Sequence, residues 1–200
     1  MNSLSCFRRA FALPLLAGLV CGGLGCGRHK TRVAAGTRDQ ILHLGKGAEP
    51  KDLDPNTQVA AIEYTIMSAL FEGLVVIAGD GETILPGVAE RWEISADKLV
   101  YTFHLRSDAR WSDGLPVTAD DFLFSFRRVF TPSMAAGNAG VGYASAGASD
   151  YKTGKNTSPD SLGLRAVDAR TFEIRLAHPA PLPFFRAWRG SLHAGAAPRD

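Results

Sequence analysis

Residues that could act as nucleophiles, bases or metal ligands are scattered along this chain. Its five histidines are far apart: His29, His43, His104, His178 and His193. A hydroxyl lies close to a histidine only at Ser191 and His193, where the Gly-x-Ser-x-Gly elbow and an acid to orient the base are both missing. No histidine pair has zinc spacing, and no glycine-rich loop opens a helix as in a P-loop. The sequence therefore predicts a protein that is not an enzyme and uses no metal or cofactor.

Two other groups of residues could carry a function, but each also has a structural explanation. The adjacent carboxylates Asp120 and Asp121 could hold a hard cation or transfer protons. They stand at the start of a predicted helix, where negative charge is favourable, and this accounts for both. The three tryptophans, Trp92, Trp111 and Trp188, could stack on a ligand. Isolated tryptophans in strands and turns are more often packing anchors, so we interpret them as structural.

The first 25 residues are typical of a secretory signal. A basic start with Arg8 and Arg9 precedes an apolar run over residues 10–20 that is too short to span a bilayer. The chain has 22 basic and 20 acidic residues, and no acid lies in residues 1–25. Without that segment the charges balance, so nothing favours a nucleic-acid partner.

The cysteines predict a membrane anchor. They lie at positions 6, 21 and 26, so a mature chain starting at Cys26 has no internal disulfide. Gly25 precedes Cys26 and a polar tether follows, which favours a lipid-modified first residue that holds the protein at a membrane surface. A bacterial lipobox usually has leucine three residues before the cysteine, whereas this chain has Gly23. The alternative is a plain secretory signal cut near residues 33–35.

The elements that would position these residues centre on residues 88–130. Alternating apolar residues over 99–105 predict a half-buried strand in a hairpin, and Trp111 to Gly114 predicts a turn. Thr118 and Asp121 are spaced as a helix cap. The helix should bury one face and stop before Pro132: Phe122, Phe126, Val129 and Phe130.

Weaker patterns flank this stretch. We expect a first strand over 40–45, a helix over 62–70, hairpins over 74–85 and 162–176, a polar loop over 151–161 and a short helix over 182–188. The helix over 62–70 carries an apolar stripe that we interpret as core packing, with Gly73 fit to end it: Ile62, Ile66, Ala69 and Leu70.

The central stretch closely resembles the oligopeptide- and dipeptide-type extracellular solute-binding proteins of ABC importers, family 5. The resemblance rests on Gly-Val-Ala-Glu-x-Trp from Gly87, on residues 101–106, and on Trp-Ser-Asp-Gly-x-Pro-Val-Thr-Ala-x-Asp-Phe from Trp111. It extends more loosely to Leu53-Asp54-Pro55. It implies a mixed α/β (α+β) fold of the periplasmic-binding-protein type II kind and a function in peptide transport through a membrane permease.

The resemblance also implies a domain division. Residues 1–25 would be the signal and 26–40 the lipid-anchored tether. Residues 41–71 would start ligand-binding lobe I, 72–186 would form an accessory lobe, and 187–200 would return to lobe I. Because family members are much longer, the opposing lobe is absent, and we expect this sequence to be the amino-terminal part of a longer protein. A strand over 40–45 without partners would be prone to aggregation.

In peptide-binding members, the segment between Leu-Asp-Pro and the following helix contacts the ligand. Its main chain forms strand-like hydrogen bonds with the peptide backbone. By resemblance this implies Val59, Ala60 and Ala61, although the same residues could be an ordinary lead-in to a helix. The nearest acid, Glu63, is predicted to be helical. The alternatives to peptide capture are a carrier of another solute (nickel chelate, haem or sugar) or an envelope lipoprotein scaffold that binds no small ligand.

Overall fold

The computed structural model describes residues 31–41, 45, 47–57, 60–134, 136 and 143–180, and it divides at residue 46 into two units. In the first, helix α2 (Arg32–Asp39) begins at Thr31, whose hydroxyl accepts a hydrogen bond from the Ala34 amide. Gln40 ends the helix in the left-handed conformation, with φ of 57°. The expected tether is therefore partly helical, and Gln40 closes a helix where we had predicted the start of a strand. Residues 42–44 of that predicted strand lie outside the described part.

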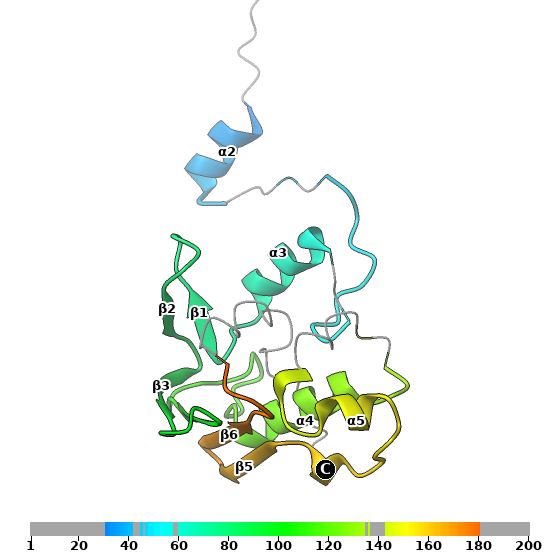
Figure 1. Cartoon of the computed structure of the whole chain (residues 1–200). Coiled ribbons are helices and arrows are strands. Elements are labelled where there is room, and N and C mark those ends of the chain that lie inside the picture. Colours follow the sequence, from blue (N-terminus) through cyan, green and yellow to red (C-terminus); the bar gives the residue numbers. More distant parts are fainter. Residues whose placement is uncertain are drawn as a thin grey trace, which may run out of the picture. The chain divides into compact units, whose positions relative to one another are not determined.

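The second unit is built around a four-stranded antiparallel sheet (Figure 1). Its strands, in spatial order, are β3 (Ala89–Ile94), β4 (Val100–Leu105), β6 (Thr171–Arg175) and β5 (Leu164–Asp168). Tyr101, Phe103 and Leu105 of β4 are 1%, 0% and 3% exposed, so the predicted alternation is confirmed. Both predicted hairpins of this sheet form.

Helix α4 (Ala119–Phe130) supplies the other half of the core. The four apolar residues predicted for its inner face are fully buried. Phe126 lies against Phe172 of β6, with ring centroids 5.5 Å apart. Burial of each such side chain stabilises the fold by about 1.5–3 kcal/mol, so the contact between α4 and the sheet contributes substantially to the stability of this unit.

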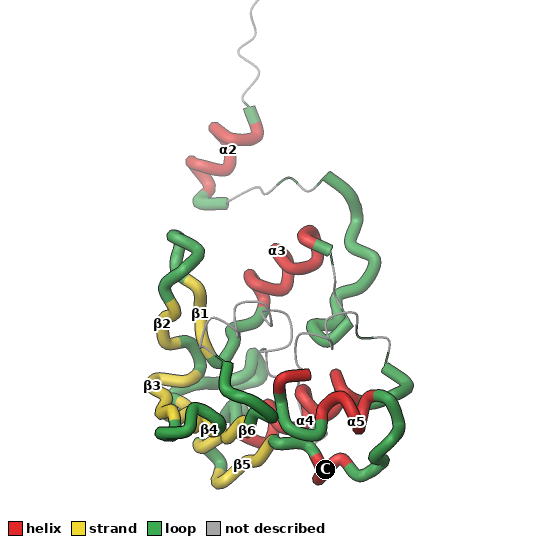
Figure 2. Tube along the Cα trace, viewed as in Figure 1, coloured by secondary structure: helices red, strands yellow, loops and turns green. Residues whose placement is uncertain are grey.

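Smaller elements surround this core (Figure 2). Strands β1 (Val75–Ile77) and β2 (Ile84–Pro86) form the predicted two-stranded hairpin. The polar loop predicted over 151–161 is wrong in part, because α5 (Ala148–Lys152) and the 3-10 turn η2 (Pro159–Ser161) extend into it. Lys152 fastens α5 to the end of α4, because its ammonium donates hydrogen bonds to main-chain carbonyls at and just after that end. The helix predicted over 182–188 lies outside the described residues.

Helix α3 (Ala61–Leu70) forms as predicted, but its apolar stripe is not core. Leu70 is 66% exposed, whereas Glu63 and Met67 are the buried residues of the helix. The reason is that Glu63 faces the preceding loop, where it accepts a hydrogen bond from the Lys51 amide. Phe71, rather than Gly73, caps the end of the helix. None of the described helices combines the length and apolar character needed to cross a membrane.

Candidate functional site

The segment expected to contact a ligand offers main chain rather than side chains. Ala60 is exposed and extended, with φ and ψ of −92° and 153°, and Ala61, also exposed, is the first residue of α3. The Ala60 carbonyl already accepts a hydrogen bond from the Tyr64 amide. Among the described residues, no side chain caps the start of α3, so its first amides are the groups available to a ligand. Val59 lies outside the described residues.

The turn before this segment is closed by its own side chains. The Asp54 carboxylate accepts a hydrogen bond from the Asn56 amide at 2.9 Å, and its carbonyl accepts one from the Thr57 amide. Pro55 presets the backbone of the turn. The Asp52 carboxylate accepts from the Asp54 amide at 3.0 Å. The Asp-x-Asp-Pro-Asn-Thr sequence is therefore a self-bonded turn.

This turn is tied to helix α4. The Arg128 guanidinium donates from Nη1 to Asp54 Oδ1 at 2.7 Å, and Nη2 donates to Oδ2, which makes the pair bidentate. The hydrogen bonds from Arg128 hold the pKa of Asp54 below its usual range and raise that of Arg128. A second contact lies deeper, where the Ser125 hydroxyl donates to Asn56 Oδ1 at 3.0 Å. Asn56 and Ser125 are both buried, at 1% and 0% exposed.

Glu63 closes the other end of the loop. It is helical, as predicted, and only 4% exposed. Its Oε1 accepts a hydrogen bond from the Lys51 amide at 3.1 Å, and its buried Oε2 has no partner. In this position the carboxylate faces the loop and offers no exposed charge for a basic ligand group.

The other candidate side chains have structural roles where they are described. Asp121 is buried and accepts hydrogen bonds from Thr118 at the start of α4, as the cap spacing predicted, and Trp111 donates to the same carboxylate. His104 pairs with Arg91 in the register of β3 and β4, and its Nε2 lies 3.2 Å from Oε1 of Glu93, two residues further along β3. Within the described ranges no cluster of three His, Cys, Asp or Glu side chains could hold a metal. The remaining candidates lie outside these ranges: Cys26, Trp188, Ser191 and His193.

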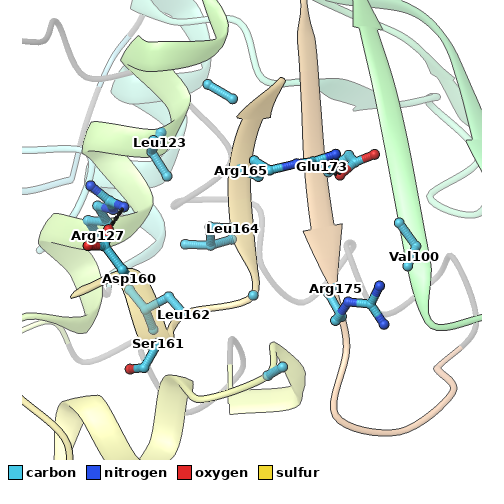
Figure 3. A pocket seen from close by; sticks show the side chains of 13 residues that line it. Val100, Leu123, Arg127, Asp160, Ser161, Leu162, Leu164, Arg165, Glu173 and Arg175 are labelled. Atoms are coloured by element: carbon cyan, nitrogen blue, oxygen red, sulfur yellow. Dashed lines mark hydrogen bonds and ion pairs between the residues drawn. The ribbon is translucent and has the colours of Figure 1, made fainter. Parts of the chain in front are cut away.

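A cavity of about 600 Å³ borders α4, β5 and β6. Figure 3 shows Arg127 on α4 beside Asp160, and Arg165 on β5 beside Glu173 on β6. Arg127 Nη2 lies 2.6 Å from Asp160 Oδ1, and Arg165 Nε lies 3.0 Å from Glu173 Oε2. Two of the three arginines in the lining are thus paired with carboxylates, and the third is Arg175. Among the described residues of 54–61, none lines this cavity.

The fold identifies the class of protein. The chain superposes on Haemophilus influenzae OppA, solved in complex with the peptide RPPGFSPFR, with a TM-score of 0.68 and 37% identity over 74% of this chain and 29% of that one. The mixed helix and sheet arrangement is therefore that of a type II-like periplasmic binding protein, as the sequence predicted.

Residues 83–196 match the family model described as bacterial extracellular solute-binding proteins, family 5, middle region, and the chain belongs to this family. It is 39% identical to the periplasmic oligopeptide-binding protein OppA of Escherichia coli over 87% of this chain and 32% of that protein. It is also 39% identical, over 71% of this chain and 26% of the relative, to E. coli YgiS, a periplasmic protein whose name proposes deoxycholate as its ligand. The matched part of the chain thus spans between a quarter and a third of the length of these curated relatives.

Two residues that bond the Asp54–Asn56 turn were not predicted from the sequence. Arg128 and Ser125 lie in a helix interpreted only as core, and 74 and 69 residues separate them from Asp54 and Asn56. One signal was available: Ser125 is a small polar residue among the apolar positions of the inner face of α4. A buried hydroxyl needs a hydrogen-bond partner, but the pattern does not say which residue supplies it.

Proposed function

We propose that the protein carrying this sequence captures peptides outside the cytoplasm and delivers them to the permease of an ABC importer. Membership of family 5 supports this proposal, together with the likeness to a relative solved with a bound peptide. Because the chain spans about a third of its relatives, the proposal concerns the whole protein to which residues 1–200 belong. In that protein, residues 41–71 and 187–200 would belong to ligand-binding lobe I and residues 72–186 to the accessory lobe.

Capture needs no covalent step. The amide of Ala61 would donate a hydrogen bond to a peptide carbonyl, as in strand addition, and Ala60 and Val59 would continue the contact. Main-chain contacts of this kind do not depend on the side chains of the ligand, so they suit a carrier of many peptides. The protein would then act as a carrier and not as an enzyme.

A main-chain contact can be tested by removing one amide. Ala61→Pro deletes the Ala61 amide, yet proline is well tolerated at the first position of a helix, and Ala60 already has the extended backbone that a residue before proline needs. Ala61→Ser keeps the amide and is the matched control. We expect Ala61→Pro, but not Ala61→Ser, to weaken binding of a defined tripeptide to the protein purified from its native cell by about tenfold.

The ligand class needs its own measurement. Mass spectrometry of the small molecules that co-purify with the native protein should find peptides of varied sequence, displaced by a peptide mixture. Retention of a non-peptide solute that peptides do not displace would contradict peptide capture and favour the other-solute alternative, which the name of YgiS keeps open. Retention of no solute would favour the scaffold alternative.

We further propose that the protein is exported and anchored by lipid at Cys26. The basic start, short apolar run and small residue before the cysteine support this. Detergent extraction of the membrane fraction and intact mass measurement should show acyl chains on a protein that begins at Cys26. An unmodified amino terminus near residues 33–35 would contradict the anchor.

A further inference from the structure

The Asp54–Asn56 turn, which precedes Ala60 and Ala61 in the sequence, is bonded to helix α4. We infer that Arg128 and Ser125 of helix α4 are positioning residues that fix the Asp54–Asn56 turn and thereby hold Ala60 and Ala61 ready for a ligand. This inference rests on the proposed function, because it assigns the role of residues that do not touch the ligand themselves.

The contact between Arg128 and Asp54 has a geometry that restrains the turn. Arg128 meets Asp54 with two hydrogen bonds, and a bidentate guanidinium–carboxylate pair fixes orientation as well as distance. The side chains of Asp54 and Arg128 are 23% and 36% exposed, so water screens the pair only in part. Asp54 also closes its own turn through the Asn56 amide, so a restraint on its carboxylate is transmitted to the backbone.

Burial strengthens the contact between Ser125 and Asn56. Both residues are buried, so their hydrogen bond is shielded from competition by water. Asn56 and Ala60 are only four positions apart in the sequence, so fixing the turn limits how far Ala60 can move. At the far end, Glu63 binds the Lys51 amide. The chain is therefore restrained on both sides, at Asn56 and at Glu63, while Ala60 and Ala61 stay exposed.

Helix α4 supplies both contacts to the turn. It packs against the sheet with four fully buried apolar residues, which makes it a rigid support. Helix α3, which carries Ala61, has an exposed apolar face instead, with Leu70 66% exposed. Because α3 is weakly packed among the described residues, we assign the placement of Ala61 to the contacts from α4.

The test compares neighbouring arginines of the same helix. Arg128→Gln removes the ion pair to the turn, and Arg127→Gln removes the matched pair to Asp160, which does not touch the turn. Amide hydrogen exchange of Asn56, Thr57 and Tyr64, whose amides donate hydrogen bonds within the turn and to the Ala60 carbonyl, should be about tenfold faster in Arg128→Gln than in the Arg127→Gln protein, with exchange in β4 and β6 unchanged. Unchanged exchange at the turn would overturn the inference.

Binding of a defined tripeptide is the second readout. If loss of the ion pair lowers the fraction of molecules with an ordered segment tenfold, apparent affinity should fall about tenfold in Arg128→Gln and remain at the native value in Arg127→Gln. Arg128→Lys keeps the positive charge but loses the bidentate guanidinium, so its apparent affinity should lie between those of Arg128→Gln and Arg127→Gln. It replaces Arg128→Gln in the comparison if that variant does not fold. Faster exchange without weaker binding would contradict a positioning role. If the native protein binds no tripeptide, the proposed function fails, and the exchange comparison alone decides whether α4 holds the turn.

Discussion

The indole N–H of Trp111 donates a hydrogen bond to Oδ2 of Asp121 at 3.3 Å, and the same oxygen accepts from the Thr118 amide at 2.9 Å. One carboxylate thus joins the Trp-Ser-Asp-Gly turn to the start of helix α4. Gly114 completes the turn with φ of 88°, a conformation that suits glycine. The most recognisable motif of the chain is therefore a structural joint between the sheet and α4.

Replacing Asp121 should weaken this joint. Asp121→Ala removes the acceptor at the helix start and leaves the half-buried indole without its bond, so we expect a loss of about 1–2 kcal/mol in the free energy of unfolding. Asp120→Ala is the control, because Asp120 is exposed and contributes mainly through the helix dipole, about 0.3–1 kcal/mol. Urea unfolding followed by tryptophan fluorescence measures both, and equal losses would contradict the joint.

Lys152 should matter more than its surface position suggests. Its ammonium donates to the carbonyls of Val129, Thr131 and Met134 at 3.2, 2.8 and 2.6 Å. Lys152→Met leaves these carbonyls without the donor and should cost about 1–3 kcal/mol in urea unfolding. Lys155→Met removes only an exposed pair to Asp150, 3.8 Å away, and should change stability by less than about 0.5 kcal/mol. Similar costs for both would rule out the helix-end role.

Gly147 should resist substitution for two separable reasons. Its φ is 73°, and a Cβ there would lie 2.2 Å from the Ser161 carbonyl oxygen. Gly81 has nearly the same φ, 75°, but open space around it, so Gly81→Ala measures the backbone strain alone, about 1–2 kcal/mol. We expect Gly147→Ala to cost about 1–3 kcal/mol more, because the backbone must shift to relieve the clash. Thermal unfolding of the two variants compares them, and equal melting temperatures would exclude the clash.

The ion pair of Asp54 should make stability depend on acid pH. Arg128 holds the pKa of Asp54 below its usual range, so the folded state binds this proton less readily than the unfolded state. The stabilisation is therefore fully present above about pH 4, the ordinary value, and is lost as the pH falls through the lower folded value. Asp54→Asn removes it at every pH.

In urea unfolding between pH 5 and pH 7, the free energy of unfolding of Asp54→Asn should thus be about 1–2 kcal/mol lower than that of the wild type. This loss is larger than that typical of an exposed ion pair and smaller than that of a buried one. The difference should shrink below pH 4. A difference that persists unchanged to pH 2 would show that Asp54 acts through packing and not through its charge.

Much of the fold follows from short stretches of sequence. The alternation of buried and less buried side chains that defines β4 is contained within residues 99–105. The buried face of α4 follows from apolar residues three and four positions apart. The cap formed by Thr118 and Asp121 joins residues three positions apart. These features were predictable because backbone periodicity and capping bonds act between near neighbours in the chain.

The tertiary structure alone decided which face of α3 is buried and what holds the candidate segment. The apolar stripe that ends at Leu70 predicted a core face, but the hydrogen bond from the Lys51 amide to Glu63 turns another face inward. The contacts from Arg128 and Ser125 to the turn cross 74 and 69 residues of sequence. The spacing of apolar residues predicts that a helix has an apolar side. Which side is buried depends on the surface against which the helix packs, and that surface forms only when distant segments fold together.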